Sequence, residues 1–254
     1  MSFGQPHRHY ARTDSTNTRA RELAAAGAPD GTIVTAAEQT AGRGRQGRTW
    51  TAPPGKALLY SAVLRPLDER HLLLPLAVPL AVCAAAEELA PGIEYGVKWP
   101  NDIQVEGRKL AGALIEARPQ DGWAVIGIGL NLTISQDEFP PDLRDKAISI
   151  SGAEQRGKGV SRRSLPAVDP PRHPLTPLVA AEVLNRHLAK WIEAEPDAVL
   201  GAWRERDALR GKEVSWDGGS GVAAGIDDRG HLVVVTAAGD RVAVGAGEVH
   251  LTVG

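Results

Sequence analysis

The segment AGRGRQGRTW, residues 41–50, concentrates side chains that can bind an anion. Arg43, Arg45 and Arg48 alternate with glycines, which allow positive φ, and each guanidinium group offers paired donors to an oxyanion. Such a loop can wrap around a phosphate, while a solvated basic loop or an RGG-like nucleic-acid-binding segment has the same composition. Trp50 is suited either to stack on a base or to anchor the loop in the core. The segment therefore indicates an anion site.

The arginine loop, residues 42–49, is predicted to be mobile when no anion is bound. No apolar side chain lies between Gly42 and Thr49 to pack against a core. The three guanidinium groups repel one another, and we expect them to have no protein partner. A bound phosphate would offset part of the entropy lost when the loop becomes ordered.

A second polar segment, KWPNDIQVEGRKLAG, spans residues 98–112. Its notable side chains are those of Lys98, Asn101, Asp102, Arg108 and Lys109. The first part is compatible with a surface turn whose backbone is satisfied by Asn101 and Asp102. The flanking residues are patterned like strands, and so many charges close to a core indicate a polar site.

Charge and composition limit the class of protein. The 254 residues include 29 Lys and Arg against 31 Asp and Glu, a formal net charge of −2, so no global basic field favours nucleic-acid binding. Cys83 is the one cysteine, which excludes an internal disulfide and suits a reducing cytosol. The first residues contain no apolar stretch typical of an export signal. We therefore expect a folded, cytoplasmic protein.

Alternating helix and strand patterns must position these segments. The spacing of apolar residues predicts a helix over residues 18–27, stopped by Gly27, and strands over 32–38, 56–64 and 123–132. Residues 94–117 predict two strands joined by a turn at Glu106-Gly107. Gly127 and Gly129 interrupt the last strand, which indicates close approach of a backbone or a ligand.

The most apolar stretch, residues 72–90, is interrupted by Pro75 and Pro79 and closed by Glu87 and Glu88. It is shorter than the roughly 20 apolar residues that a membrane span needs. Its apolar residues continue around every helical face, so we expect a buried helix that starts near Pro79.

The C-terminal half divides near residue 210. Residues 151–177 are polar, basic and rich in proline, which predicts a mobile surface loop. Helices are expected over 178–194 and 198–209. Short alternating strands then follow over 212–218, 221–228, 231–238 and 241–251, a spacing typical of a small SH3-like barrel. We expect a catalytic domain of residues 1–210 and a barrel of residues 211–254.

Five motifs, in this order and at this spacing, resemble those of the biotin–protein ligases. They are DSTNTRARELA, EQTAGRGRQGRTW, KWPNDI, GRKLAGALIE and GIGLNL, within residues 13–132, and GAGEVHL resembles part of the family's terminal barrel. The resemblance implies an α/β (α+β) fold, in which a mixed-sheet catalytic domain similar to class II aminoacyl-tRNA synthetases precedes a small SH3-like β-barrel.

The resemblance also implies a reaction, that of a biotin–[acetyl-CoA-carboxylase] ligase. Biotin attacks the α-phosphate of ATP, pyrophosphate leaves, and the biotinyl-5′-AMP formed passes its biotin to a lysine of a biotin carboxyl carrier protein. Since the first step brings two anions together, cations must lie between them. Mg²⁺ is expected on the triphosphate, and no metal site is assigned to the protein's own side chains.

Residues at matching positions take the family's roles. Lys109, Arg43 and Arg45 are the implied catalytic residues, with Lys109 holding the biotin carboxylate and offsetting charge on the α-phosphate. The residues implied to bind biotin are Ser15, Thr16, Asn17, Gln39, Gly42, Arg43, Arg45, Lys109 and Gly112. Those implied to bind ATP or its adenosine are Arg48, Trp50, Asn101, Asp102, Gly129 and Asn131.

Several of these roles have alternatives. Ser15 and Thr16 could cap a helix instead of binding biotin. Asp102 could position a metal or brace its loop. Gly112, Gly127 and Gly129 fit places where only a hydrogen atom has room beside the ligand.

Two other functions remain open from the sequence. A lipoate–protein ligase would share the acyl-adenylate chemistry, and a non-enzymatic nucleic-acid-binding module could use the arginine loop with the small barrel. No helix-turn-helix segment precedes DSTN, so we expect a ligase without a repressor domain and without sequence-specific DNA binding. The expected partner is the carrier protein, and no membrane partner is expected.

Overall fold

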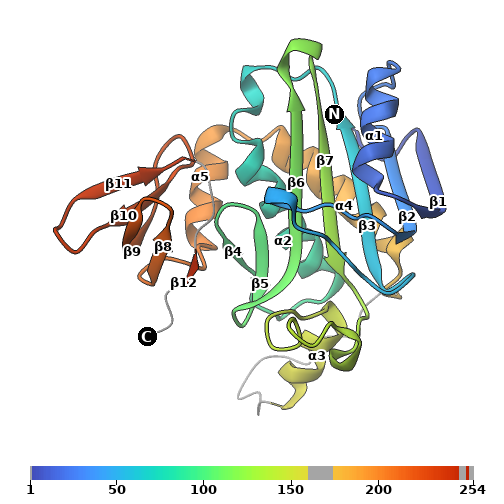
Figure 1. Cartoon of the computed structure of the whole chain (residues 1–254). Helices are drawn as coiled ribbons and strands as arrows, with labels where there is room; N and C mark the ends of the chain where they lie inside the picture. Colours follow the sequence, from blue (N-terminus) through green and yellow to red (C-terminus); the bar gives the residue numbers. More distant parts are fainter. Residues whose placement is uncertain (1, 160–173, 246–249, 252–254) are drawn as a thin grey trace.

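A seven-stranded mixed sheet lies at the centre of the molecule (Figure 1). The computed structural model describes residues 2–159, 174–245 and 250–251. The strands are β1 (His7–Thr13), β2 (Ile33–Gln39), β3 (Ala57–Leu64), β4 (Gly96–Lys98), β5 (Asp102–Val105), β6 (Arg108–Arg118) and β7 (Trp123–Asn131). Their order is β1-β2-β3-β7-β6-β5-β4, with β1 parallel to β2 and the other neighbours antiparallel. The predicted mixed sheet is confirmed. Strand β1 was not predicted, because its histidines and arginines form no apolar pattern.

The two faces of the sheet are covered differently. Leu58 and Tyr60 of β3 point into a large core with α2 (Leu74–Leu89) and α4 (Pro177–Ile192), which lie behind the sheet in Figure 1. Val63 points the other way, towards α1 (Thr16–Ala25). We call the α1 side the front face. A separate cluster that includes Leu59 and Phe139 covers the other end of this face.

Helix α2 differs from its prediction in where it begins. It starts at Leu74, before the predicted start near Pro79. Pro75 fits the first turn, where a missing N–H costs nothing. Most of the helix is buried, and this burial offsets the hydrogen bond that Pro79 cannot donate inside it. The predicted buried helix is otherwise confirmed.

The predicted mobile loop over residues 151–177 is partly wrong. Residues Ile150–Gly159 form helix α3, whose first turn buries Ile150 and Ala153 in the core. At the other end, Thr176 caps α4 by accepting a hydrogen bond from the Val179 N–H. The part of the prediction that concerns residues 160–173 lies outside the described residues.

Residues 94–117 form parts of three strands where two were predicted. A short β4 precedes the Trp99–Asn101 turn, and β5 follows it. The predicted turn at Glu106-Gly107 joins β5 to β6 and is confirmed. Both of its residues have positive φ, 51° and 76°, as a two-residue hairpin turn needs.

A β-bulge changes the register between β5 and β6. Asp102 pairs with Gly112 and Ile103 with Ala111, but Gln104 pairs with Lys109, so Leu110 is the extra residue. Because side chains alternate along a strand, the extra residue turns Lys109 towards the same face as Asp102 and Gly112.

The C-terminal part contains a second sheet, drawn in red in Figure 1. Helix α5 (Pro196–Glu205) precedes it, and its order is β11-β10-β9-β8-β12. The strands are β8 (Glu213–Trp216), β9 (Gly219–Ile226), β10 (Leu232–Val235), β11 (Arg241–Val244) and β12 (His250–Leu251). The predicted short strands are therefore present, and the barrel remains a prediction. Val214 and Val234 of this second sheet share the large core with the seven-stranded sheet, and the Trp99 indole N–H donates to the Gly230 carbonyl at 3.0 Å.

Short 3₁₀ segments occupy several connections. They are Arg45–Gly47, Glu69–His71, Pro119–Asp121 and Gln136–Glu138. In the part of the chain that the structure describes, no helix has the length and apolar character needed to cross a membrane.

Candidate functional site

A strip of glycines crosses the front face of the sheet. Gly112 of β6 pairs with Gly129 of β7, and Gly127 lies two residues further along β7 on the same face. In the same register, Asp102 flanks Gly112, and Lys98 flanks Asp102. The strip therefore joins the two polar segments found in the sequence.

Lys109 and Asp102 form an ion pair at the β5 end of this strip. The Lys109 Nζ lies 2.7 Å from the Asp102 carboxylate and 5.7 Å from the centre of the Trp50 ring. A Cβ at Gly112 would lie 3.2 Å from Nζ, so glycine leaves room for the ammonium group. Lys109 is also fixed through its backbone, which is hydrogen-bonded to Lys146 and Ile148. The bulge thus brings a partly exposed cation to the front face.

The arginine loop is held by protein partners, so the prediction that its arginines have none is wrong. Arg43 pairs with Glu116 at 3.2 Å, and Arg45 donates to the Asn101 side-chain oxygen at 3.3 Å. A β-bridge between Arg43 and Thr49 closes the base of the loop. The sequence pattern could not show this, because Glu116 and Asn101 lie on distant segments that only the sheet brings near.

Positive charge exceeds negative charge around this end of the strip. Burial lowers the pKa of Lys98, an effect that Asp102 opposes and that Lys109 and Arg48 reinforce. Burial also lowers the pKa of Arg45, again against the effect of Asp102. A guanidinium group stays charged near neutral pH, so Arg45 remains a cation. Cations this close to one another are expected to attract a further anion.

Trp50 lies against the glycine strip. A Cβ at Gly129 would come within 2.3 Å of its indole ring, so the glycine predicted to face a ligand faces this side chain. The buried indole N–H finds no acceptor among the described residues, and a ligand oxygen could supply one. Glycine is needed at residue 42 because a Cβ there would lie 2.2 Å from the Trp50 carbonyl oxygen.

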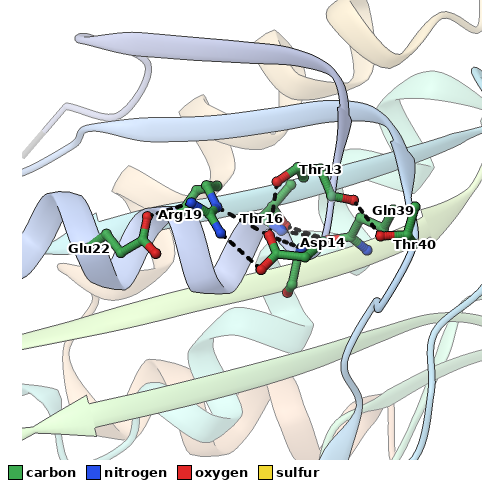
Figure 2. Close-up of polar contacts among 8 residues, drawn as sticks. Thr13, Asp14, Thr16, Arg19, Glu22, Gln39 and Thr40 are labelled. Atoms are coloured by element: carbon green, nitrogen blue, oxygen red, sulfur yellow. Dashed lines mark hydrogen bonds and ion pairs between the residues drawn. The ribbon is translucent and has the colours of Figure 1, made fainter.

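Thr16 and Gln39 bind each other at the start of α1 (Figure 2). The Gln39 side-chain oxygen accepts from the Thr16 N–H at 2.7 Å and from the Thr16 hydroxyl at 3.0 Å. Gln39 therefore satisfies a helix N-terminal amide from a distant strand. Ser15 is the N-cap residue but makes no side-chain capping bond, so its hydroxyl does not perform the capping alternative.

Asn17 lies beneath these residues and is buried. Its side-chain oxygen accepts from the Ser61 hydroxyl at 2.6 Å, and its amide donates to the Glu116 carboxylate at 2.8 Å. A Cβ at Gly127 would lie 2.0 Å from the same oxygen, so Gly127 makes room for Asn17. Asn17 was predicted to bind biotin, but its side-chain oxygen and its amide both form hydrogen bonds within the protein.

Asp14 supports the same helix start (Figure 2). Its carboxylate accepts hydrogen bonds from Arg19, the Ser15 N–H and the Thr13 hydroxyl. Chiefly through Arg19, these contacts lower the pKa of Asp14 from 3.8 to about 2. A lowered carboxyl pKa stabilises the fold above the unfolded pKa, and this contribution is lost as pH falls towards the folded pKa.

We expect Asp14→Asn to flatten the loss of stability in acid. Between pH 3.8 and about 2, wild type should lose more of its melting temperature than the variant, because only wild type takes up a proton at this site. Thermal melts across this range measure the difference. Because Asp14 is exposed, the effect should be small. Parallel curves for the two proteins would show that Asp14 contributes no pH dependence.

The remaining site residues occupy structural positions nearby. Asn101 donates to the Ala113 carbonyl at 2.6 Å, and the buried Asn131 donates to the Ile148 carbonyl at 3.0 Å. Arg48 lies close enough to Lys98 and Arg45 to lower their pKa values. The structure therefore gathers all the predicted segments on the front face but shows protein contacts for both asparagines.

Three residues of this region were not assigned a role from the sequence. Ser61 is a fully buried polar residue in an otherwise apolar strand, which is a signal that sequence reasoning could have used. Lys98 had been explained as part of a surface turn, yet it is half-buried beside a buried Trp99. Glu116 ends the GRKLAGALIE motif, and nothing in the local pattern singles it out.

A cavity of about 590 Å³ lies beside the arginine loop. Its wall includes Arg43, Arg45 and Asn101 on one side and apolar residues from the start of α2 on another. Arg229 and His231 of the C-terminal sheet complete it. The loop therefore faces both the glycine strip and this second space.

The described residues do not form a metal site of their own. Residues 2–159, 174–245 and 250–251 contain no group of three or more His, Cys, Asp or Glu side chains that could hold an ion. Asp102, the carboxylate on the strip, is already paired with Lys109. These residues fit an anionic ligand better than a resident cation.

Comparisons with known proteins agree with this chemistry. The model of the Biotin/lipoate A/B protein ligase family matches residues 10–132. The biotin–[acetyl-CoA-carboxylase] ligase of Mycobacterium tuberculosis is 35% identical over 254 residues, covering 95% of this chain and 87% of the relative. A biotin protein ligase from Aquifex aeolicus, solved with biotin and ATP, has a TM-score of 0.74 at 26% identity, covering 98% of this chain and 99% of that one.

A further relative is longer than the matched region. The bifunctional ligase/repressor BirA of Bacillus spizizenii is 42% identical over 144 residues, which cover 55% of this chain and 44% of the relative. The chain thus spans about half the length of the bifunctional relatives that it matches. Agreement in sequence with most of the Mycobacterium tuberculosis ligase, and in fold with the Aquifex aeolicus ligase, shows that this chain belongs to the biotin–protein ligase family.

Proposed function

We propose that this protein is an ATP-dependent biotin–protein ligase that forms biotinyl-5′-AMP and transfers biotin to a lysine of a biotin carboxyl carrier protein. The observation that carries the proposal is the placement of Lys109. A bulge turns its ammonium group to the face that also holds the arginine loop and Trp50. The 35% identity over 95% of the chain to a ligase of this name supports the same activity.

Lys109 would act first, by holding the biotin carboxylate. A carboxylate approaching a phosphate is repelled unless fixed cations offset the charge of both groups. The Lys109 ammonium group has three N–H donors, so it can keep its bond to Asp102 and donate another to the ligand. The carboxylate oxygen then attacks the α-phosphorus, and the bond to the bridging oxygen of pyrophosphate breaks.

Arg43 and Arg45 would contact the phosphate region of the adenylate, with Arg48 assisting from the same loop. In the structure Arg43 contacts a partly exposed carboxylate, and Arg45 donates to a neutral amide. A phosphate oxyanion is a stronger acceptor for a guanidinium than an amide oxygen. The loop can therefore change partners on binding, and the closed loop would exclude water from the reactive anhydride.

The nucleotide and biotin would lie at opposite ends of the strip. Trp50 would offer an aromatic surface for adenine, and we assign Asn101 and Asn131, whose amides donate to backbone carbonyls in the structure, to polar contacts with the adenosine. Thr16 and Gln39 offer donors and acceptors for the ureido group of biotin. Mg²⁺ would arrive on the triphosphate as part of the substrate.

The proposal also covers the domain organisation and the cellular location of the protein. We place the catalytic domain in residues 1–210 and assign residues 211–254 to a small SH3-like barrel, on the basis of the second sheet. A cytoplasmic location fits the single buried Cys83, whose thiol pKa is raised by burial to about 12.

Biotin-dependent exchange of pyrophosphate into ATP tests the function. We expect exchange with biotin and none with lipoate. Exchange with lipoate alone would identify a lipoate–protein ligase instead. Salt-sensitive binding of nucleic acid with no exchange would favour a nucleic-acid-binding module.

Gln39→Ala should weaken biotin binding about two- to tenfold and leave ATP affinity unchanged. The variant loses one hydrogen bond to the ureido group, and such a bond contributes about 0.5–1.5 kcal/mol. Calorimetric titrations with each ligand measure the split, and Gln136→Ala, which alters an exposed amide elsewhere, is the control. Equal weakening of both ligands would contradict the assignment of Gln39 to biotin.

A further inference from the structure

Glu116 lies at the centre of the charged contacts of the front face. Its Oε2 accepts from the Asn17 amide at 2.8 Å. Its Oε1 lies 3.3 Å from Arg21 and 3.2 Å from Arg43. One carboxylate therefore meets two guanidinium groups, one from α1 and one from the arginine loop.

The carboxylate is itself held in place from below. Asn17 is buried and accepts from the Ser61 hydroxyl, whose oxygen lies 2.8 Å from the Thr16 hydroxyl. Thr16 in turn bonds to Gln39. Since Ser61 and Asn17 are buried, these bonds are shielded from water and fix the position of Glu116 more firmly than a surface contact would.

Other contacts of the arginine loop involve its backbone and Arg45. Arg45 meets a neutral amide at 3.3 Å, and Gln46 and Gly47 at the tip have positive φ and are exposed. Glu116 is thus the charged group that ties Arg43 to the rigid sheet. A guanidinium held in this way loses less freedom when it binds an anion.

We propose that Glu116 is a positioning residue for the first step: it fixes Arg43 beside the glycine strip so that the guanidinium is in place for the nucleotide phosphate. The proposal rests on the proposed ligase function. Glu116 does not touch the substrate, and it acts only through Arg43. Its loss should therefore affect ATP binding and leave biotin binding nearly unchanged.

The test compares Glu116→Gln, Arg43→Ala and the double variant in biotin-dependent pyrophosphate exchange. Glu116→Gln keeps an oxygen that can accept from Asn17 but removes the charge that holds Arg43. We expect its KM for ATP to rise about tenfold and its KM for biotin to change less than about twofold. In the double variant we expect the KM for ATP to equal that of Arg43→Ala alone, because the two residues act as a unit.

Glu88→Gln is the matched control. Glu88 also meets two basic side chains, Arg186 and His187, but it joins α2 to α4 behind the sheet. This variant should behave as wild type. Arg21→Ala should also keep a normal KM for ATP, which distinguishes the Glu116–Arg43 ion pair from the Glu116–Arg21 ion pair.

The outcomes separate this inference from the function on which it rests. If wild type shows no biotin-dependent exchange, the proposed function fails. If wild type is active and Glu116→Gln has an unchanged or lower KM for ATP, the positioning role is wrong. Fully additive effects in the double variant would also overturn it, because Glu116 would then act independently of Arg43.

Discussion

Lys109→Ala is expected to lower biotin-dependent pyrophosphate exchange by about two to three orders of magnitude while the protein stays folded. In the proposed mechanism the ammonium group offsets the charge of the biotin carboxylate and the charge that develops at the α-phosphate. Removing one fixed electrostatic partner of a transition state typically has an effect of this size. The side chain is partly exposed, so its loss leaves no buried cavity.

Exchange rates and melting temperatures should be measured together for this variant. Lys190→Ala is the matched control, because its Nζ lies 5.8 Å from the Trp191 ring, much as Lys109 lies 5.7 Å from Trp50. The control should keep normal exchange. Near-normal exchange in folded Lys109→Ala would show that another cation, such as Lys98, holds the carboxylate.

Gly129→Ala is expected to raise the KM for ATP by about tenfold to a hundredfold, the second largest effect. The new Cβ would lie 2.3 Å from the indole ring of Trp50, so the ring must leave its position on the strip. Adenine would then lose a stacking surface, and stacking on an aromatic side chain contributes about 1–3 kcal/mol per base. Biotin affinity should change little.

Two further variants, Gly201→Ala and Trp50→Ala, complete the test of Gly129→Ala. Gly201 has nothing within 4 Å of an added Cβ and lies in α5, so Gly201→Ala should not affect either ligand. Trp50→Ala should reproduce the effect of Gly129→Ala on ATP. If Gly129→Ala weakens biotin and ATP equally, the displaced ring does not serve the nucleotide specifically.

Much of the fold could be predicted because its signals are local. Apolar alternation predicts β2, β3 and β7, and the Glu106-Gly107 pair predicts the turn before β6. By contrast, β1 has no apolar alternation because none of its residues is fully buried. The polar stretch after residue 150 was predicted to be a loop because its helix, α3, depends on burying Ile150 and Ala153 against distant residues.

The residues of the candidate site were predicted, but the contacts between them were not. The motif series identified Lys109, Asp102 and the arginine loop, and the structure brings these residues together. Gly127 and Gly129 were predicted to leave room for a ligand, yet their nearest neighbours are Asn17 and Trp50. Such pairings join residues far apart in the chain, so no local pattern contains them.

The bulge in β6 makes the orientation of Lys109 depend on how the strand pairs as well as on which residues it contains. Gln104 and Asp102 face Lys109 and Gly112 across one extra residue, Leu110. If β6 paired with β5 without the bulge, side chains would alternate regularly back from Gly112, and Lys109 would point into the apolar core behind the sheet. A relative that kept every residue of the motif but lost the bulge would therefore turn the ammonium group away from the site.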